Sequence, residues 1–464
     1  MRITFNGAAQ TVTGSQYFLE VNGQRLLLEC GLYQGHRAET YINNQNFRFN
    51  PRSLDAVILS HAHIDHSGNL PNLVKHGYEG PIYTTKATAR LAEVMLEDSG
   101  HIQEADAMYA NQKRLRRGEP PIEPLYTIED AKRVFPLFKR LNYRQTFEPV
   151  KGVTAQLVDA GHILGSASVI LDVEENGRKF RVWFSGDIGR KDLPLVKDPT
   201  LPEKPDYMIM ECTYGDKPKR DPEEGYAELR SVLVRTFARN GKVIIPAFAV
   251  GRTQELVYFI NQMISAGDIP SIPVFVDSPL AVAASKVFKE FPEYFDAETA
   301  KFVLEGRHPA LDFPNLTYTQ SVEESKALND RREPMVIISA SGMAETGRIL
   351  HHLRNNIEND RNTILIVSWQ APNTLGRLLA EQAPQVRIYG QLFDRRAEVV
   401  TIGTFSAHAG QDTLLDYVRA ARPQLKKLYL IHGEPDKANA LIDKLCAEHF
   451  CDITYPKLYD SVEI

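Results

Sequence analysis

Three histidines and one aspartate fall within six consecutive positions of this sequence: His61, His63, Asp65 and His66. The segment follows the apolar run 54–59, so we expect it to begin where a buried strand ends. Imidazole nitrogen and carboxylate oxygen are ligands that zinc accepts, and His61 and His63 point to the same side of an extended backbone. We interpret this density of ligands as a site for two metal ions. The alternative, a polar loop that is rich in histidine by chance, is disfavoured because the 464 residues contain only 13 histidines.

Three further polar residues stand among small neighbours near the ends of expected strands. They are His162 in a glycine-rich segment, Asp187 after Ser185-Gly186, and His408 after Ser406-Ala407. Small neighbours let the backbone approach a site closely. Taken singly, each of these residues is more often structural than functional, and only the cluster at 61–66 makes them candidate ligands.

The first 190 residues predict mainly short strands with a few helices, which indicates layered sheets with helices outside. Thr127 is the expected N-cap of the second helix. The expected strands are 26–30, 54–60, 81–84, 155–159, 168–173 and 180–185, and the expected helices are 87–98 and 128–141.

From about residue 214 the pattern changes to alternating helices and strands, which is typical of a largely parallel sheet. The expected elements are helices 223–239 and 252–266 with strands 242–246, 274–276, 335–339 and 363–367. After residue 398 we expect strand 399–402, helix 413–419 and strand 428–431. This last part again has short strands and histidines, as the first 190 residues do.

Composition indicates a soluble globular protein of two or three domains, with 43% apolar and 24% charged residues. We expect no membrane segment and no signal peptide, and therefore a cytoplasmic protein. The four cysteines lack metal-binding spacing and are expected to be reduced. A net charge of −5 argues mildly against a nucleic-acid partner, although only the local field at a site attracts substrate.

These segments together resemble the ordered motifs of the metallo-β-lactamase superfamily, β-CASP branch. The resemblance extends from Thr13 to the His432-Gly433-Glu434 loop and is greatest to stand-alone bacterial ribonucleases related to the eukaryotic mRNA 3′-end cleavage factor. The segments that carry it are Glu29-Cys30-Gly31, the cluster at 61–66, Gly161-His162, Ser185-Gly186-Asp187, Glu211-Cys212-Thr213-Tyr214-Gly215 and Ser406-Ala407-His408.

The resemblance implies an α/β protein: a metallo-β-lactamase αββα sandwich formed by residues 1–211 and 397–464, with a β-CASP domain inserted at 212–396. It further implies two zinc ions that activate a shared hydroxide. His61, His63 and His162 would hold one zinc, Asp65, His66 and His408 the other, with Asp187 bridging. Glu29 stands where Asp is usual and could orient a ligand histidine.

The implied activity is cleavage of single-stranded RNA, with Asp65, Asp187 and Glu211 among the catalytic residues. A domain inserted before His408 suits a polymer substrate. The cleavage factor carries a histidine shortly before its last zinc ligand, and we find none between His352 and His408. The general acid is therefore unassigned, with His352 or a zinc-bound water as the hypotheses.

Two strand–helix junctions of the inserted domain are candidate phosphate contacts, because backbone N–H groups at a helix start can hold phosphate. They are Ser339, Ser341 and Gly342 in one junction and Arg252 in the other.

Three alternatives remain open: a DNA-directed nuclease of the same branch, a hydrolase of a small lactam, thioester or lactone, and a metal-free binding subunit. The choice between endonuclease and 5′ exonuclease is open as well. Relatives are often dimers, so a homodimer is a candidate assembly.

Overall fold

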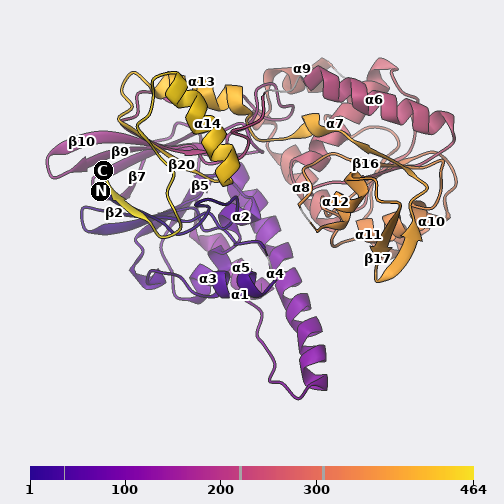
Figure 1. Ribbon diagram of the computed structural model, residues 1–464, viewed down its shortest axis with the longest axis horizontal. Coiled ribbons are helices and arrows are strands. Elements are labelled where there is room, and N and C mark those ends of the chain that lie inside the picture. Colours follow the sequence, from indigo (N-terminus) through magenta and orange to yellow (C-terminus); the bar gives the residue numbers. More distant parts are fainter. Residues whose placement is uncertain (36, 219–221, 306–308, 372) are drawn as a thin grey trace. The chain divides into compact units, whose positions relative to one another are not determined.

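The computed structural model describes residues 1–35, 37–218, 222–305, 309–371 and 373–464 (Figure 1). The chain divides into two compact units. Three stretches of chain form the first unit: Met1–Lys191, Asp198–Lys219 and His408–Ile464. The second unit comprises Asp192–Lys197 and Arg220–Ala407. Among the described residues, no helix is long and apolar enough to cross a membrane.

Two seven-stranded sheets form the centre of the first unit. In order across the first sheet, the strands are β22 (Ser461–Glu463), β1 (Arg2–Phe5), β2 (Tyr17–Val21), β3 (Gln24–Leu28), β4 (Ala56–Ile58), β5 (Ile82–Thr85) and β6 (Phe138–Leu141). Across the second sheet they are β21 (Ile453–Thr454), β20 (Lys427–Ile431), β11 (Tyr207–Glu211), β10 (Arg178–Phe184), β9 (Ala167–Glu175), β8 (Val153–Asp159) and β7 (Phe147–Val150).

Apolar side chains from both sheets share one core, to which Phe5 and Tyr17 of the first sheet and Phe184 of the second contribute. Helices α13 (Gln411–Ala421) and α14 (Pro435–Ala447) pack on the other face of the second sheet, around Trp183. Helices α1 (Arg37–Gln45), α2 (Ile64–Ser67), α3 (Leu70–Lys75), α4 (Lys86–Arg116) and α5 (Ile128–Val134) lie beside the first sheet (Figure 1). The predicted αββα sandwich is confirmed.

The second unit contains a six-stranded sheet in which each pair of neighbouring strands is parallel, as predicted. Its order is β14 (Leu316–Tyr318), β13 (Val274–Val276), β15 (Val336–Ser339), β12 (Val243–Pro246), β16 (Thr363–Ile366) and β19 (Glu398–Thr401). The helices of this unit are α6 (Pro222–Ala238), α7 (Arg252–Ala266), α8 (Pro279–Glu290), α9 (Ala297–Glu305), α10 (Val322–Asp330), α11 (Ile349–Asn356) and α12 (Leu375–Ala380). A separate hairpin consists of β17 (Gln385–Ile388) and β18 (Gln391–Asp394).

Three expected elements differ in the structure. The helix expected at 128–141 begins after the N-cap Thr127, which forms a capping box with Asp130, but ends at Val134. Pro136, two residues further on, lacks the N–H that a continuing helix needs, and 138–141 becomes strand β6. The helix expected at 87–98 continues to Arg116. Strand β19, which we expected in the C-terminal part of the sandwich, pairs with β16 of the second unit.

Candidate metal centre

The predicted ligands of the first unit lie in loops, and in the short helix α2, that follow strands of both sheets. The segment 61–66 follows β4, His162 follows β8, and Asp187 follows β10. These loops pack closely: a Cβ at Gly31 would lie 1.7 Å from the carbonyl oxygen of Asp65. Only glycine therefore permits the loop after β3 to lie against the segment that carries the ligands.

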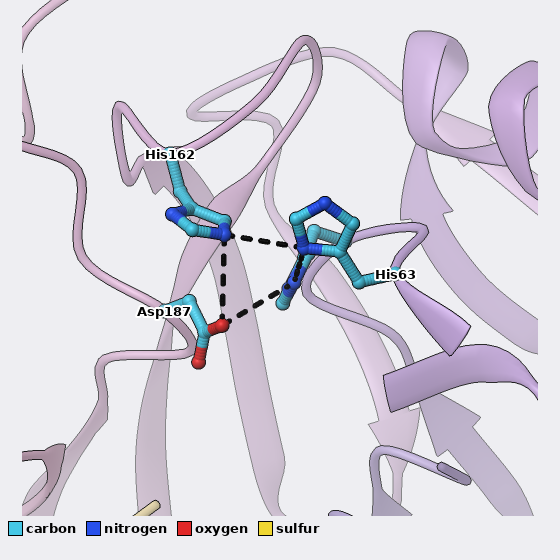
Figure 2. A group of neighbouring side chains, drawn as sticks. His63, His162 and Asp187 are labelled. Carbon is cyan, nitrogen blue, oxygen red and sulfur yellow. Dashed lines mark hydrogen bonds and ion pairs between the residues drawn. The ribbon is translucent and has the colours of Figure 1, made fainter. Parts of the chain in front are cut away.

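Four side-chain atoms converge in a first group, part of which is drawn in Figure 2. His63 Nδ1 lies 3.1 Å from His61 Nε2 and 3.2 Å from His162 Nε2. Asp187 Oδ2 lies 3.6 Å from the Nε2 atoms of both His61 and His162. A regular tetrahedron with metal–nitrogen distances of about 2.0–2.1 Å has ligand–ligand distances of about 3.3–3.4 Å. The spacing therefore fits one tetrahedrally bound metal ion.

A second group lies around the other oxygen of Asp187. His66 Nε2 is 3.3 Å from Asp187 Oδ1 and 3.3 Å from His432 Nε2. His432 Nε2 is in turn 3.4 Å from Asp65 Oδ2. Asp187 is buried, and its Oδ1 has no hydrogen-bond donor among the described residues. A buried carboxylate oxygen without a donor indicates a cation site, because burying it uncompensated is costly.

His432 is a residue that our sequence analysis did not select. The sequence held a signal for it, because the expected strand 428–431 ends directly before His432-Gly433, just as β4 ends before the segment at 61–66. We used this loop only as the limit of the resemblance.

The second ring nitrogen of three histidines is held by a neighbouring side chain. Ser60 Oγ lies 2.9 Å from His61 Nδ1, and Thr213 Oγ1 lies 3.0 Å from His432 Nδ1. Glu29 Oε2 lies 2.9 Å from His66 Nδ1, and its Oε1 accepts a hydrogen bond from the backbone N–H of Ser60. Such partners fix the orientation of a histidine that binds metal.

His408 lies beside Glu211 rather than beside Asp65 and His66. Its Nδ1 is 3.1 Å from Glu211 Oε1 and 3.9 Å from Asp187 Oδ2. Glu211 is buried, and its oxygens accept hydrogen bonds from the N–H groups of Ile188 and Thr213. Among the predicted ligands, His408 therefore lies apart from the second group, with Glu211 as the nearest partner of its Nδ1.

The pKa values of the candidate histidines are shifted in two opposite directions. Burial lowers the pKa values of His61 and His162 well below their usual range and lowers the pKa of His63 to about 4. These rings are neutral at pH 7, as metal ligands must be. Burial alone would also lower the pKa of His408, but the charge and hydrogen bond of Glu211 raise it to about 9. At that pKa the ring of His408 carries a proton at neutral pH. Burial would also lower the pKa of His66, but the charges of Asp187 and Asp65 raise it well above its usual range, so a raised pKa does not by itself separate a proton donor from a ligand.

His352 does not fit the role of general acid. It is fully buried in the second unit, and its Nε2 lies 2.6 Å from Asp277 Oδ2. Asp277 also accepts hydrogen bonds from Arg348, Ser325 and Thr319. Burial would raise the pKa of Asp277, but these bonds together lower it. A proton donor must reach its substrate, so we withdraw His352.

Three of the candidate phosphate contacts are engaged within the second unit. Arg252 is buried in an ion pair with Glu255. Ser339 is buried and donates to the carbonyl oxygen of Asp277 at 2.7 Å. Ser341 Oγ accepts hydrogen bonds from two backbone N–H groups in its own loop. The loop precedes α11, which begins at Ile349.

A sandwich of this kind with a convergent histidine–aspartate site defines a metallo-hydrolase, and comparison with known proteins agrees. "Metallo-beta-lactamase superfamily domain" matches residues 18–177, "Beta-Casp domain" residues 253–379, and "Zn-dependent metallo-hydrolase RNA specificity domain" residues 393–454. The chain belongs to the β-CASP branch of the metallo-β-lactamase superfamily, and this membership implies binding of divalent metal.

Among curated relatives, Ribonuclease TTHA0252 of Thermus thermophilus is 36% identical over the full length of both chains. Transcription termination factor FttA of Thermococcus kodakarensis is 30% identical over 100% of this chain and 71% of its own length. A crystal structure of a protein of unknown function from Enterococcus faecalis V583 has a TM-score of 0.54 and 15% identity, covering 100% of this chain and 99% of that one. This last likeness concerns the fold alone.

Proposed function

We propose that this protein is a zinc-dependent ribonuclease that hydrolyses phosphodiester bonds of single-stranded RNA. The observation that carries the proposal is the pair of ligand groups that share Asp187, one oxygen in each group. The likeness to a Thermus ribonuclease over the whole chain supports RNA as the substrate.

The ligand geometry favours a changed assignment for the second metal ion. His61, His63 and His162 would hold one zinc, Asp187 would bridge, and the other zinc would take the side chains of Asp65, His66 and His432. His432 thus replaces the predicted His408, because it lies 3.3 Å from His66 Nε2 whereas His408 is held by Glu211. When bound, such ions supply an activated water nucleophile and neutralise charge on the phosphate.

The residue that gives a proton to the leaving oxygen is, in this proposal, His408. Its Nδ1 faces Glu211, which leaves Nε2 as the atom that could donate. Glu211 keeps the ring protonated and oriented, and its own position is fixed by the N–H of Ile188 at 2.7 Å. The sequence has no histidine between His352 and His408 that could be this donor. In this proposal His408 itself donates the proton, and His432, later in the chain, is the last metal ligand.

The test is incubation of the zinc-loaded protein with single-stranded RNA and DNA of matched sequence, each labelled at one end. We expect RNA fragments, about two zinc ions per chain and loss of cleavage after chelation. Internal fragments would identify an endonuclease and terminal mononucleotides an exonuclease. Cleavage of DNA alone, or turnover of a chromogenic β-lactam with both strands intact, would overturn the proposal. Sizing of the same sample tests the homodimer.

A further inference from the structure

Two large aromatic side chains are exposed at one edge of the parallel sheet in the second unit. Phe248 follows β12 and is 43% exposed, and Trp369 follows β16 and is 46% exposed. Because β12 and β16 are neighbouring parallel strands, their carboxyl ends lie at the same edge. Both rings therefore belong to one face of the unit.

Both loops contact the same residue, Gly342, in the loop after β15. A Cβ at Gly342 would lie 3.0 Å from Cδ2 of Phe248, so the ring rests against this glycine. On the other side, Gln370 Nε2 donates to the carbonyl oxygen of Gly342 at 3.0 Å. Phe248 and Trp369 thus flank one short piece of backbone.

The backbone that carries each ring is held by polar side chains. The carbonyl oxygen of Phe248 accepts from Thr253 Oγ1 at 2.8 Å, at the start of α7. The buried side chain of Gln370 donates to the carbonyl oxygen of Ser368 at 3.1 Å, which fixes the chain on both sides of Trp369. Fixed loops that leave two aromatic rings half exposed are not explained by core packing, since burial of apolar area is favourable.

The faces of these rings are open to a planar ligand. Among the described residues, neither Phe248 nor Trp369 makes a ring–ring or cation–π contact, whereas Tyr389, also exposed in this unit, hydrogen-bonds to His351 at 3.0 Å. The loop between the two rings uses N–H groups of its own on Ser341. This edge is therefore better suited to an aromatic base than to a phosphate.

We propose that Phe248 and Trp369 form a base-stacking site for the single-stranded RNA substrate. The proposal rests on the ribonuclease function proposed above and adds the part of the strand that the second unit recognises. Stacking on an aromatic side chain tolerates any base, and loss of one such contact weakens binding by roughly 5- to 150-fold. The site therefore confers affinity for unpaired bases without a sequence preference.

The fluorescence of Trp369 can report RNA binding at this site, because the only other tryptophan, Trp183, is fully buried. We would titrate the zinc-loaded full-length protein with a hydrolysis-resistant phosphorothioate RNA 12-mer and record tryptophan fluorescence. We expect quenching by the 12-mer and little quenching by an abasic strand with the same backbone. Equal quenching by both strands would overturn stacking, since only the backbone would then be recognised.

The variants Phe248→Ala and Trp369→Ala should each weaken binding by the factor given above, with the effect on cleavage appearing in KM rather than kcat. Trp369→Phe should retain most of the affinity while losing the fluorescence change, and Tyr389→Ala is the matched control on the same unit. If both alanine variants bind and cleave like the wild type while the wild type cleaves RNA, the stacking site is wrong and the ribonuclease proposal stands. If the wild type leaves RNA intact, the ribonuclease proposal itself fails.

Discussion

The metal centre of the first unit and the Asp277 cluster of the second unit use the same residue types in opposite ways. In the first, Asp187 Oδ1 is buried without a hydrogen-bond donor and ring nitrogens face one another at 3.1 to 3.3 Å. In the second, four side chains donate to the carboxylate of Asp277.

This contrast separates a ligand from a structural residue better than residue type does. Buried acceptors that face one another require a cation, whereas a carboxylate whose acceptor sites are filled by donors is already stabilised. His352, in helix α11, and His432, after strand β20, are both buried histidines, and their partners show which of them belongs to the metal centre.

The largest expected effect is at the shared carboxylate. Asp187→Asn removes the negative charge between the two ligand groups, so we expect loss of bound zinc and a decrease in kcat on the order of 10³-fold. Metal analysis and cleavage of end-labelled RNA measure both quantities. Full activity with two zinc ions retained would contradict the assigned site.

His408→Ala and His432→Ala should distinguish the roles of the two histidines that come after the second unit in the sequence. We expect His408→Ala to lower kcat by roughly 10²- to 10⁴-fold with zinc content unchanged, as for loss of a general acid. His432→Ala should instead lower zinc content. The reverse pattern would restore His408 as the ligand.

The pH profile gives a second measurement on the same pair. Because the pKa of His408 is raised to about 9, its proton is present at pH 7 and is lost as pH rises through that value. Activity should therefore fall on the alkaline side near pH 9. Glu211→Gln removes the negative charge that raises this pKa, so the fall should move to lower pH. An unchanged alkaline limb would exclude His408 as the donor.

A smaller effect is expected for the side chains that orient the ligands. Glu29→Gln and Thr213→Val remove partners of His66 and His432, respectively, and each should weaken zinc affinity by about 10- to 100-fold. Competition with a chelator measures this change. Gln24→Ala, a change on β3 far from the ligands in sequence, is the control.

Asp277→Ala should affect stability rather than chemistry. It leaves the buried His352 and the partly exposed Arg348 without their shared carboxylate, at a cost of about 3–5 kcal/mol in the free energy of unfolding. Because the pKa of Asp277 is lowered, this contribution is present above the unfolded value of about 3.9 and is lost as pH falls below it. Denaturation at neutral and acid pH measures it, and zinc content should not change.

The sequence predicted the layered sheets, the parallel sheet and most of the side chains that converge at the candidate metal centre, because strand-end histidines and alternating apolar runs are local signals. Local pattern could not separate His408 from His432, since both follow small or strand residues and differ only in which side chains fold against them. It also extended the helix from 128 to 141, although Pro136 stood within it.

The hydrogen bond between Glu211 and His408 joins residues 197 positions apart, on either side of the second unit. His432 lies later still, only 32 residues before the last residue, Ile464. During translation, the segment at 61–66 emerges long before its partners. The site can be completed only after the second unit and the segment up to His432 have been made, so under the proposed function a nascent chain that has not reached His432 has no complete site for cleaving RNA.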